Sequence, residues 1–220
     1  MDDVRLYGYW RSSASWRARI GLNLCGVAFD YIPVHLLHGE HVAAEHLGRN
    51  PLGQVPVLAW TDAGGVSRRL TQSIAILELL AEQHPGALLP ADVFARARAR
   101  QLAETVNSGI QPFQNLWLTR RINAEPDADG RAIGKEAIER GLAAMERECG
   151  LASGDAAPGA WLVGDAPSVA DICLIPQLYN ARRFEIDVDA FPTLLRAEAS
   201  AAEHPAFAGA RPEVQPDAQV

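Results

Sequence analysis

Three serines and three arginines gather near the N-terminus, in the stretch RSSASWRARIGLNLCG at residues 11–26. Apolar residues recur there at fourfold spacing, at Trp16, Ile20 and Leu24, which predicts a helix over residues 15–25. The N-terminus of a helix carries partial positive charge and free N–H groups, so it stabilises an anion such as a thiolate. A hydroxyl of Ser12, Ser13 or Ser15 can add a hydrogen bond to that sulfur. The alternative is that these serines only cap the helix and shape the turn before it.

Two further polar segments each lie at a predicted element boundary. In NPLGQVPVL, at residues 50–58, Gln54, Val55 and Pro56 come directly before a strand. A proline there can be cis, and the main chain beside it can stay open to a peptide-like ligand. In TQSIAI, at residues 71–76, Gln72 and Ser73 begin another predicted helix. Their side chains and the free N–H groups of the helix can hold a carboxylate.

Arginines are unevenly placed in a chain of net charge −7, which leaves room for a local positive pocket. Those near segments that can converge are Arg11, Arg17, Arg19, Arg120, Arg121, Arg182 and Arg183. The guanidinium is a planar fork of donors that matches a carboxylate and stays charged at any relevant pH. Arg183 stands near the end of a largely apolar helix, where burying a charge is costly unless it meets an anion. The alternative for Arg11 and Arg183 is a surface ion pair, with Glu185 or Asp187 as the partner of Arg183.

These residues are positioned by an N-terminal unit that is predicted as β-α-β-α-β-β-α over the first 83 residues. Strands are predicted at residues 4–10, 29–34, 55–60 and 67–70, and helices at residues 15–25, 41–47 and 72–83. The prolines and glycine of HPGALLPAD then indicate a linker at residues 85–91. The predicted domains are therefore an α/β domain at residues 1–84 and a second domain at residues 92–220.

The second domain has a helical pattern throughout. Apolar residues at three- and four-residue steps predict a helix that Pro112 bends or ends: Ala99, Leu102, Ala103, Val106 and Ile110. Another long helix is predicted at residues 127–150. SVAD at residues 168–171 predicts a capping box, in which Ser168 accepts from the N–H of Asp171 while that carboxylate reaches back. It opens a helix too apolar for an exposed position, and the tail at residues 211–220 is predicted to be irregular.

Composition places the chain among ordinary globular proteins and excludes several partners. Its 220 residues are 48% hydrophobic and 21% charged, without an apolar run of the roughly 18 residues that a membrane-spanning helix needs. The acidic balance disfavours nucleic acid and an anionic membrane as partners. The N-terminus lacks the basic and apolar segments of a secretory signal, so we expect a cytoplasmic protein. Cys25, Cys149 and Cys173 fit neither a disulfide framework nor a metal site, and we expect reduced, buried thiols.

The serine turn, VP and QS, in that order within one α/β unit, resemble the glutathione-binding half of the glutathione transferase superfamily. The helical half with its SVAD box is similar to that superfamily's C-terminal domain. More specific motifs resemble the zeta class, which contains maleylacetoacetate and maleylpyruvate isomerases: RSSASWR, NPLGQVPVL, QSIAILELL, GIQPFQNL, PSVADICLIPQLYNARRFEIDV and the closing QPD. The resemblance implies a thioredoxin-like N-terminal domain followed by an all-helical bundle. It also implies a homodimeric enzyme with glutathione as cofactor.

The resemblance assigns roles residue by residue. It places Ser12 at the glutathione sulfur, with Ser13 and the main chain of Ala14 and Ser15 adding polarity. The other implied cofactor contacts are Val55 and the adjoining Pro56 for the cysteinyl main chain, Gln72 and Ser73 for the γ-glutamyl carboxylate, His41 and Gln54 near the glycyl end, and Gln111 and Asn115 from the second domain. His41 is equally well a solvated surface histidine, and Gln111 and Asn115 can be ordinary helix-packing residues. Arg11 and Arg183 become clamps for the substrate, with Arg182 a solvated neighbour, and no metal is expected.

The implied reaction is a glutathione-dependent cis–trans isomerisation of a small dianionic keto acid. Thiolate adds to a double bond conjugated to a ketone, the substrate rotates about the resulting single bond, and the thiolate is expelled unconsumed. Leu116 and Trp117 stand where the maleylpyruvate branch has an arginine pair, which favours maleylacetoacetate as substrate. The alternatives are a maleylpyruvate isomerase, a transferase or dehalogenase acting on small electrophiles such as α-halo acids, and a noncatalytic interaction module. Ala14 replaces a cysteine found in many members, so no role of that thiol is carried over.

Overall fold

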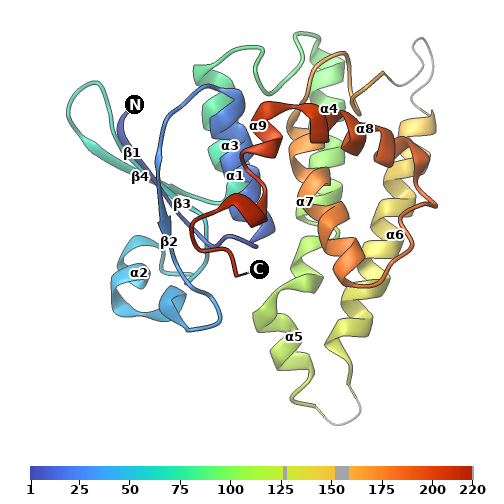
Figure 1. Cartoon of the computed structure of the whole chain (residues 1–220), viewed down its shortest axis with the longest axis horizontal. Helices are drawn as coiled ribbons and strands as arrows, with labels where there is room; N and C mark the ends of the chain where they lie inside the picture. Colours follow the sequence, from blue (N-terminus) through green and yellow to red (C-terminus); the bar gives the residue numbers. More distant parts are fainter. Residues whose placement is uncertain (126–127, 152–158, 220) are drawn as a thin grey trace. The chain divides into compact units, whose positions relative to one another are not determined.

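The computed structural model describes residues 1–125, 128–151 and 159–219 of the chain, in two compact units (Figure 1). Unit 1 comprises Met1–Leu88 and His204–Val220, and unit 2 comprises Leu89–Glu203. Unit 1 is a thioredoxin-like α/β unit and unit 2 is helical, so the predicted fold class is confirmed.

Unit 1 is built on a four-stranded mixed sheet with the strand order β2-β1-β3-β4. β1 (Asp2–Gly8) pairs in parallel with β2 (Asp30–Pro33) and antiparallel with β3 (Val57–Thr61), which pairs antiparallel with β4 (Ser67–Thr71). The four predicted strands are all present. β3 begins later than predicted, at Val57, because Pro56 has no N–H to donate to the ladder.

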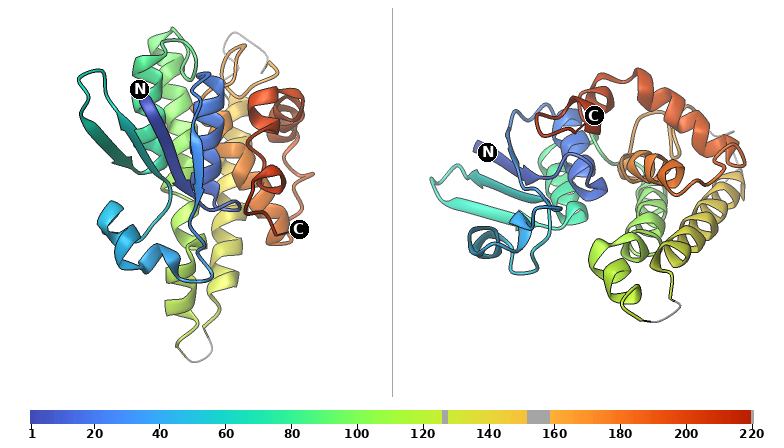
Figure 2. Two further views of the ribbon diagram at one scale, coloured as in Figure 1. Left: turned by 60° about the vertical axis from the view of Figure 1, so that its left-hand side comes forward. Right: turned by 60° about the horizontal axis from the view of Figure 1, so that its bottom comes forward.

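Two helices, α1 (Ser13–Leu24) and α3 (Ser73–Gln83), cover one face of this sheet, as Figure 2 shows. Gly21 makes their close approach possible, since a Cβ there would lie 2.4 Å from Leu77 Cδ2. The core of unit 1 includes fully buried side chains from the strands and both helices: Leu6, Ile20, Leu22, Leu58, Ile76, Leu77 and Leu80. The weak helix predicted at residues 41–47 is two short elements, the 3-10 turn η1 (Glu40–Val42) and α2 (Ala44–Arg49).

Unit 2 is a helical bundle. Its elements are α4 (Val93–Asn107), the 3-10 turn η2 (Gln111–Gln114), α5 (Leu116–Ile122), α6 (Gly130–Leu151), α7 (Val169–Arg183) and α8 (Pro192–Glu203). α4 ends before Ile110, and Pro112 lies in η2. Ile110 packs tightly against α6, where a Cβ on Gly141 would lie 2.3 Å from Ile110 Cγ1. The predicted start of α6, Asp127, lies outside the described residues.

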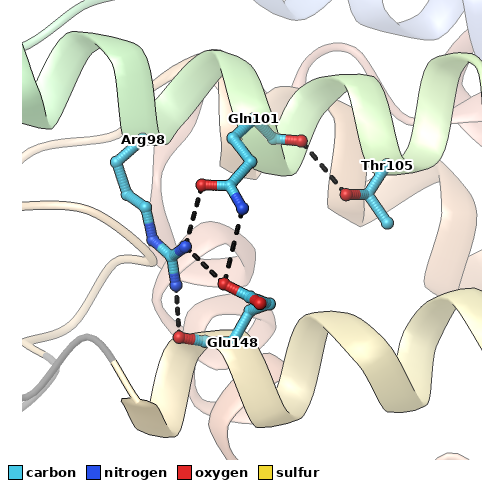
Figure 3. Close-up of polar contacts among 4 residues, drawn as sticks. All are labelled: Arg98, Gln101, Thr105 and Glu148. Carbon is cyan, nitrogen blue, oxygen red and sulfur yellow. Dashed lines mark hydrogen bonds and ion pairs between the residues drawn. The ribbon is translucent and has the colours of Figure 1, made fainter.

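A polar cross-link joins α4 to α6 inside unit 2 (Figure 3). Arg98 Nη1 lies 2.5 Å from Glu148 Oε2, and Arg98 Nη2 donates to the main-chain oxygen of Glu148. Gln101 accepts from Arg98 at 2.9 Å and donates to Glu148 Oε2 at 3.4 Å. The hydrogen bond and charge of Arg98 favour the ionised carboxylate, so the pKa of Glu148 lies below its usual value. One arginine therefore fixes α4 to the last turns of α6.

α7 begins at the predicted capping box. Ser168 Oγ accepts from Ala170 N at 3.3 Å, and Asp171 accepts from the N–H of Ser168 at 2.9 Å. Asp171 also accepts from Leu162 N at 2.9 Å and from the Ser168 hydroxyl at 3.0 Å. Because Asp171 is completely buried, the pKa of its carboxyl rises to about 6. Most of α7 is buried, as predicted.

The C-terminal residues group with unit 1, although the predicted second domain extends to residue 220. They contain α9 (Pro205–Ala208) and the 3-10 turn η3 (Pro212–Val214), so the predicted irregular tail has one short turn. Val220 lies outside the described residues. The grouping has a physical reason, because Asn23 of α1 donates to Ala206 O at 3.0 Å and Arg19 donates to Ala210 O at 3.0 Å.

Candidate functional site

The register of the sheet brings the polar segments of unit 1 to one end. Tyr7 lies opposite Val57, and Val57 lies opposite Thr71, so the end of β1, the start of β3 and the end of β4 form one row (Figure 1). The serine turn follows β1, Val55–Pro56 precedes β3, and Gln72 follows β4. The N-termini of α1 and α3 and the loop before β3 therefore meet at the same edge of unit 1.

Ser12 is the N-cap of α1. Its N–H donates to Tyr9 O at 2.9 Å, and its Oγ accepts from Ser15 N at 3.3 Å. This cap uses a lone pair of the hydroxyl and leaves the O–H proton available to a bound anion. The half-buried Ser13 is the first helical residue, and the first turn contains no acidic side chain. The helix starts two residues before the predicted Ser15 because Ser12 supplies the cap.

Ser15 stabilises the serine turn through two hydrogen bonds. Its side chain is fully buried, and its Oγ accepts from Tyr9 N at 3.3 Å. Its own N–H donates to Ser12, so the main chain and the side chain of Ser15 both stabilise the serine turn. A contact between Ser15 and glutathione stays a prediction.

The loop before β3 contains a cis Val55–Pro56 peptide, which the sequence allowed. No hydrogen bond in the described part of the chain uses the main chain of Val55. Gln54 O, by contrast, accepts from Asn50 Nδ2 at 2.8 Å and lies 2.9 Å from His46 Nε2. Sequence analysis missed these two buried side chains, although Asn50 opens the motif NPLGQVPVL. They hold Gln54 in place and leave Val55 open to a peptide-like ligand.

The start of α3 combines an exposed amide with a buried hydroxyl. Gln72 has a φ of 70°, which is uncommon for a residue other than glycine, and its side chain makes no cap bond. Such backbone persists where the surrounding structure requires it, often at ligand sites. Ser73 is 5% exposed, and its Oγ accepts from Arg17 Nη1 at 3.5 Å. Arg17 therefore links α1 to the start of α3.

Arg17 and Arg19 are buried inside unit 1, at 0% and 1% exposure. Because both side chains are buried and their guanidinium groups bind the protein itself, this finding corrects their inclusion in a possible positive pocket for a ligand. Arg19 donates from Nη2 to Trp10 O at 2.8 Å and from Nε to Ala210 O at 3.0 Å. Burial lowers the pKa of Arg19 to about 10. The sequence could not predict these contacts, because both partners of Arg19 are main-chain oxygens, which every residue type has.

Arg11 and His41 stand at the border of the same edge. Arg11 is half-exposed, and its guanidinium lies 5.3 Å from the centroid of the Trp10 ring. The half-buried His41 lies in η1 beside the loop before β3, since a Cβ on Gly53 would lie 3.1 Å from His41 O. The structure therefore places His41 beside the loop that contains Gln54, and a contact of either residue with glutathione stays a prediction.

Gln111 is the first residue of η2 in unit 2, and Asn115 directly follows η2. Gln111 is half-buried in the first turn of η2. Asn115 is the exposed N-cap of α5, where its Oδ1 accepts from Trp117 N at 3.0 Å. Helix capping explains Asn115 locally and leaves its amide N–H groups for a ligand. Leu116 and Trp117 are exposed at this helix start.

Arg183 is exposed at the end of α7 and is held by a row of amides. Its Nη1 donates to Asn180 Oδ1 at 2.9 Å. Asn180 donates in turn to Gln114, whose Nε2 donates to Gln177 at 2.9 Å. Sequence analysis missed these three amides, although Asn180 and Arg183 stand three residues apart on one helix face.

Neighbouring charges of unit 2 pair with one another. Arg182 makes two contacts of 2.6 Å with Glu198, so it is a paired surface residue. Glu185 Oε1, an alternative partner for Arg183, lies 3.9 Å from Arg131 Nη2. These pairs neutralise the residues on either side of Arg183 in the sequence.

The three cysteines are free thiols, with Cys25 half-buried and Cys149 and Cys173 buried. Burial raises the pKa of Cys25 and of Cys149 to about 11, which keeps both thiols protonated. Among the described residues, no cluster of histidine, cysteine and acidic side chains is suited to a metal ion. Within the same residues, every helix is too short or too polar to cross a membrane.

Comparison with known proteins identifies the family. The chain matches the models for the glutathione S-transferase N-terminal domain over residues 2–82 and the glutathione S-transferase C-terminal domain over residues 95–215. It is 47% identical over 217 residues to a maleylacetoacetate isomerase from Rhizobium meliloti, covering 96% of this chain and 97% of that one.

Solved structures agree with these matches. A maleylacetoacetate isomerase from Anaeromyxobacter dehalogenans, with glutathione bound in its active site, has a TM-score of 0.88 at 47% identity, covering 99% of this chain and 98% of that one. A maleyl pyruvate isomerase described as a bacterial zeta-class glutathione S-transferase has a TM-score of 0.86 at 39% identity, covering 98% and 100%. With its serine-capped α1, its cis Val55–Pro56 loop and these relatives, the chain belongs to the zeta class of the glutathione S-transferase family.

Proposed function

We propose that this protein is a glutathione-dependent isomerase that converts maleylacetoacetate to fumarylacetoacetate in the breakdown of aromatic compounds. The observation that carries the proposal is the open N-terminus of α1. Ser12 caps the helix with a lone pair, keeps its O–H proton, and has no acid in the turn that follows. Such a helix start lowers the pKa of a thiol placed on it. The relatives from Rhizobium meliloti and Anaeromyxobacter dehalogenans support this reaction.

The residues at this end of the sheet fit a γ-glutamyl-cysteinyl-glycine tripeptide. Val55, before Pro56, offers an open main chain to pair with a peptide, and the start of α3 offers an anion site. The proposed contacts are Ser12 at the sulfur with Ser13 and the main chain of Ala14 and Ser15 adding polarity, Val55 at the cysteinyl main chain, Gln72 and Ser73 at the γ-glutamyl carboxylate, His41 and Gln54 toward the glycyl end, and Gln111 and Asn115 from unit 2. Bound glutathione supplies a thiolate nucleophile that is returned at the end of the reaction.

The chain's own residues stabilise charge. Ser12 would donate its O–H to the sulfur, and the α1 N-terminus would favour the ionised form. Arg11 and Arg183 would hold the carboxylate and the developing enolate oxygen with forked donors. Donors whose bonds strengthen as charge reaches an oxygen lower the barrier to reaction. The bond from Arg183 to Asn180 fixes one N–H group of the guanidinium and so limits its rotation.

The start of α5 favours the larger of two substrates. Leu116 is 44% exposed and Trp117 is 72% exposed, and both follow Asn115, which is proposed to contact glutathione. Apolar side chains at this position suit a longer, less polar β-diketo acid better than maleylpyruvate. The zeta-class maleyl pyruvate isomerase of known structure makes maleylpyruvate the second candidate substrate.

The test is an isomerisation assay on maleylacetoacetate and on maleylpyruvate, each with and without glutathione, with the thiol counted before and after. We expect fumarylacetoacetate to form only when glutathione is present, with the thiol concentration unchanged. Thiol loss with an α-halo acid and no isomerisation would instead establish a transferase or dehalogenase. Failure to bind glutathione would contradict the proposal and favour a noncatalytic interaction module.

The role of Arg183 has its own matched control. Arg183→Leu should lower kcat/KM for isomerisation by a factor equivalent to about 2 kcal/mol of transition-state stabilisation, while the affinity for glutathione stays near the wild-type value. Arg182→Leu removes the neighbouring guanidinium, which Glu198 already pairs, and should leave kcat/KM close to wild type. Equal kinetics in the two variants would remove Arg183 from the site.

We further propose that the protein is a cytoplasmic homodimer. The first turn of α4 exposes two adjacent apolar side chains, Val93 at 70% and Phe94 at 78%. Contiguous exposed apolar surface marks protein–protein contact sites. Sedimentation at micromolar concentration should give twice the chain mass of 23.8 kDa, and a mass of one chain would contradict the dimer.

A further inference from the structure

The C-terminal segment of unit 1 returns to the serine turn. After α9 and η3 the chain reaches Asp217, in the motif QPD, for which the proposed function has no role. Two bonds anchor the segment along α1: Asn23 Nδ2 donates to Ala206 O, and Arg19 Nε donates to Ala210 O, each at 3.0 Å. The C-terminal segment is therefore bound to α1 at Ala206 and Ala210, before it reaches the serine turn.

Asp217 binds the main chain next to the candidate site. Its Oδ2 accepts from Trp10 N at 3.0 Å, while Arg19 Nη2 donates to Trp10 O at 2.8 Å. Both main-chain polar groups of Trp10 are thus held by charged side chains. Trp10 directly precedes Arg11 and Ser12. The entry to the serine turn is therefore fixed on two sides, through the N–H and the C=O of Trp10.

The contact lies in buried surroundings. Trp10 is 6% exposed and Arg19 is 1% exposed. Tyr31 Oη also lies 3.5 Å from Asp217 Oδ2, and the Arg19 guanidinium lies 5.5 Å from the centroid of the Tyr31 ring. Tyr31 therefore contacts both side chains that bind the main chain of Trp10.

The same tail reaches the loop before β3. Ala218 packs on a buried cluster of Tyr9, Trp10, Val34 and Val55. Val55 is the residue whose open main chain is proposed to pair with glutathione. Residues 217 and 218 therefore contact the neighbours of both the sulfur site and the peptide site.

We propose that Asp217 is a positioning residue of the active site. Its bond to the Trp10 N–H fixes the Arg11–Ser12 main chain, so that the Ser12 hydroxyl is held at the glutathione sulfur and Arg11 at the substrate. The inference rests on the function proposed above for Ser12 and Arg11. Asp217 acts through the Trp10 main chain, and the C-terminal segment becomes part of the catalytic unit.

The test compares two variants at this position with a control on the same tail. Asp217→Ala removes the acceptor, whereas Asp217→Asn keeps an acceptor oxygen and loses the charge. Glu213→Ala removes an exposed carboxylate of the same tail, whose partner is Arg211 at 3.7 Å rather than Trp10. The readouts are the pKa of the bound glutathione thiol, from thiolate absorbance, and the pH profile of kcat.

We expect Asp217→Ala to raise the thiol pKa by about one unit and to lower kcat at neutral pH about tenfold, with KM changed less than about threefold. Asp217→Asn and Glu213→Ala should stay near wild type. A wild-type titration curve in Asp217→Ala overturns the proposal. A tenfold defect in Asp217→Asn also overturns it, because the charge rather than the bond to Trp10 would then be required, and this arm holds even where the alanine variant does not fold.

The titration separates this proposal from the proposed function. It uses glutathione alone, so it gives a result whether or not the wild-type protein isomerises maleylacetoacetate. Hydrogen exchange at the Trp10 amide adds a second measurement, and we expect protection in wild type and in Asp217→Asn. Fast exchange of that amide in wild type would overturn the role of Asp217 and leave the isomerase proposal intact.

Discussion

Helices α1 and α7 both begin at a serine N-cap, and they differ in the third residue of the helix. Ser12 and Ser168 each accept an N–H of the first turn at 3.3 Å. The third residue of the helix is Ser15 in α1 and Asp171 in α7. In α7 the hydroxyl of Ser168 donates to Asp171, whereas the hydroxyl of Ser12 keeps its proton for another partner. We call the start of α7 filled, because the carboxylate of Asp171 occupies it, and the start of α1 open, because its first turn has no acidic side chain.

Burial follows the same division. Ser168 and Asp171 are both fully buried, and Asp171 accepts from three groups within α7 and the segment before it. Ser12 and Ser13 are only half-buried. A serine cap is thus structural where the chain supplies its own carboxylate, and suits a ligand anion where the first turn stays uncharged and accessible.

The largest effect is expected at the filled start. Asp171→Ala leaves the N–H groups of Leu162 and Ser168 buried without an acceptor, and should lower the free energy of unfolding by about 4 kcal/mol in urea denaturation. Asp92→Ala is the matched control, because the exposed Asp92 caps α4 through one bond to Ala95 N at 2.8 Å. That variant should lose about 1 kcal/mol. Equal losses in the two variants would show that burial of the box adds nothing.

The pH dependence of stability sharpens the same contrast. Burial raises the pKa of Asp171 from 3.8 to about 6, so the fold favours the protonated carboxyl. The contribution of Asp171 to the free energy of unfolding therefore falls as pH rises from about 4 to about 6, by about 3 kcal/mol in total. The difference in stability between wild type and Asp171→Ala should widen by that amount when the pH is lowered from 7 to 4. A difference that stays constant over this range would contradict the raised pKa.

Local patterns in the sequence predicted both helix starts. Hydroxyl caps, the succession of strands and helices along the chain, and the position of Val55–Pro56 depend on neighbours in sequence, and the structure has all of them. The resemblance of the motifs to one family also predicted the fold class, which the sheet and the helices confirm. The first helix was nevertheless placed two residues late, because its cap is itself a serine among serines.

What the sequence did not reveal depends on remote partners. Arg17 and Arg19 were named among the arginines of a possible local positive pocket, yet Arg17 binds Ser73 and Arg19 binds main-chain oxygens of Trp10 and Ala210. The grouping of the C-terminal tail with unit 1 depends on bonds of this kind, from Arg19 to Ala210 O and from Asn23 to Ala206 O. Periodicity cannot identify such pairs, because a main-chain acceptor carries no residue type and lies far along the chain.

The open start can be weakened by removing its hydroxyl. Ser12→Ala deletes both the cap and the donor, so the pKa of the bound glutathione thiol should rise by about one unit, and stability should fall by about 1 kcal/mol. Ser12→Thr keeps a hydroxyl and should keep a thiol pKa close to wild type. Thiolate absorbance titrations of the three proteins provide the measurement. Identical curves would assign thiolate stabilisation to the helix dipole or to Ser13.

The smallest effect comes from making the open start resemble the filled one. Ala14 is half-buried in the first turn of α1, so Ala14→Asp places the chain's own carboxylate near the N–H groups that are proposed to favour the thiolate. Like charges disfavour each other at this range, and we expect glutathione to bind about fivefold more weakly at neutral pH, with a higher thiol pKa.

Ala14→Asn has nearly the same shape as the aspartate without its charge, so it separates electrostatics from steric exclusion at this position. If a carboxylate in the first turn competes with the bound thiolate for the helix N-terminus, glutathione affinity measured by calorimetry should fall in the aspartate variant only. The loss should shrink at higher salt, because the carboxylate is partly exposed and therefore screened. Equal weakening in both variants would show that a larger side chain at position 14 blocks glutathione sterically, and that the absence of an acid from the first turn of α1 has no electrostatic role.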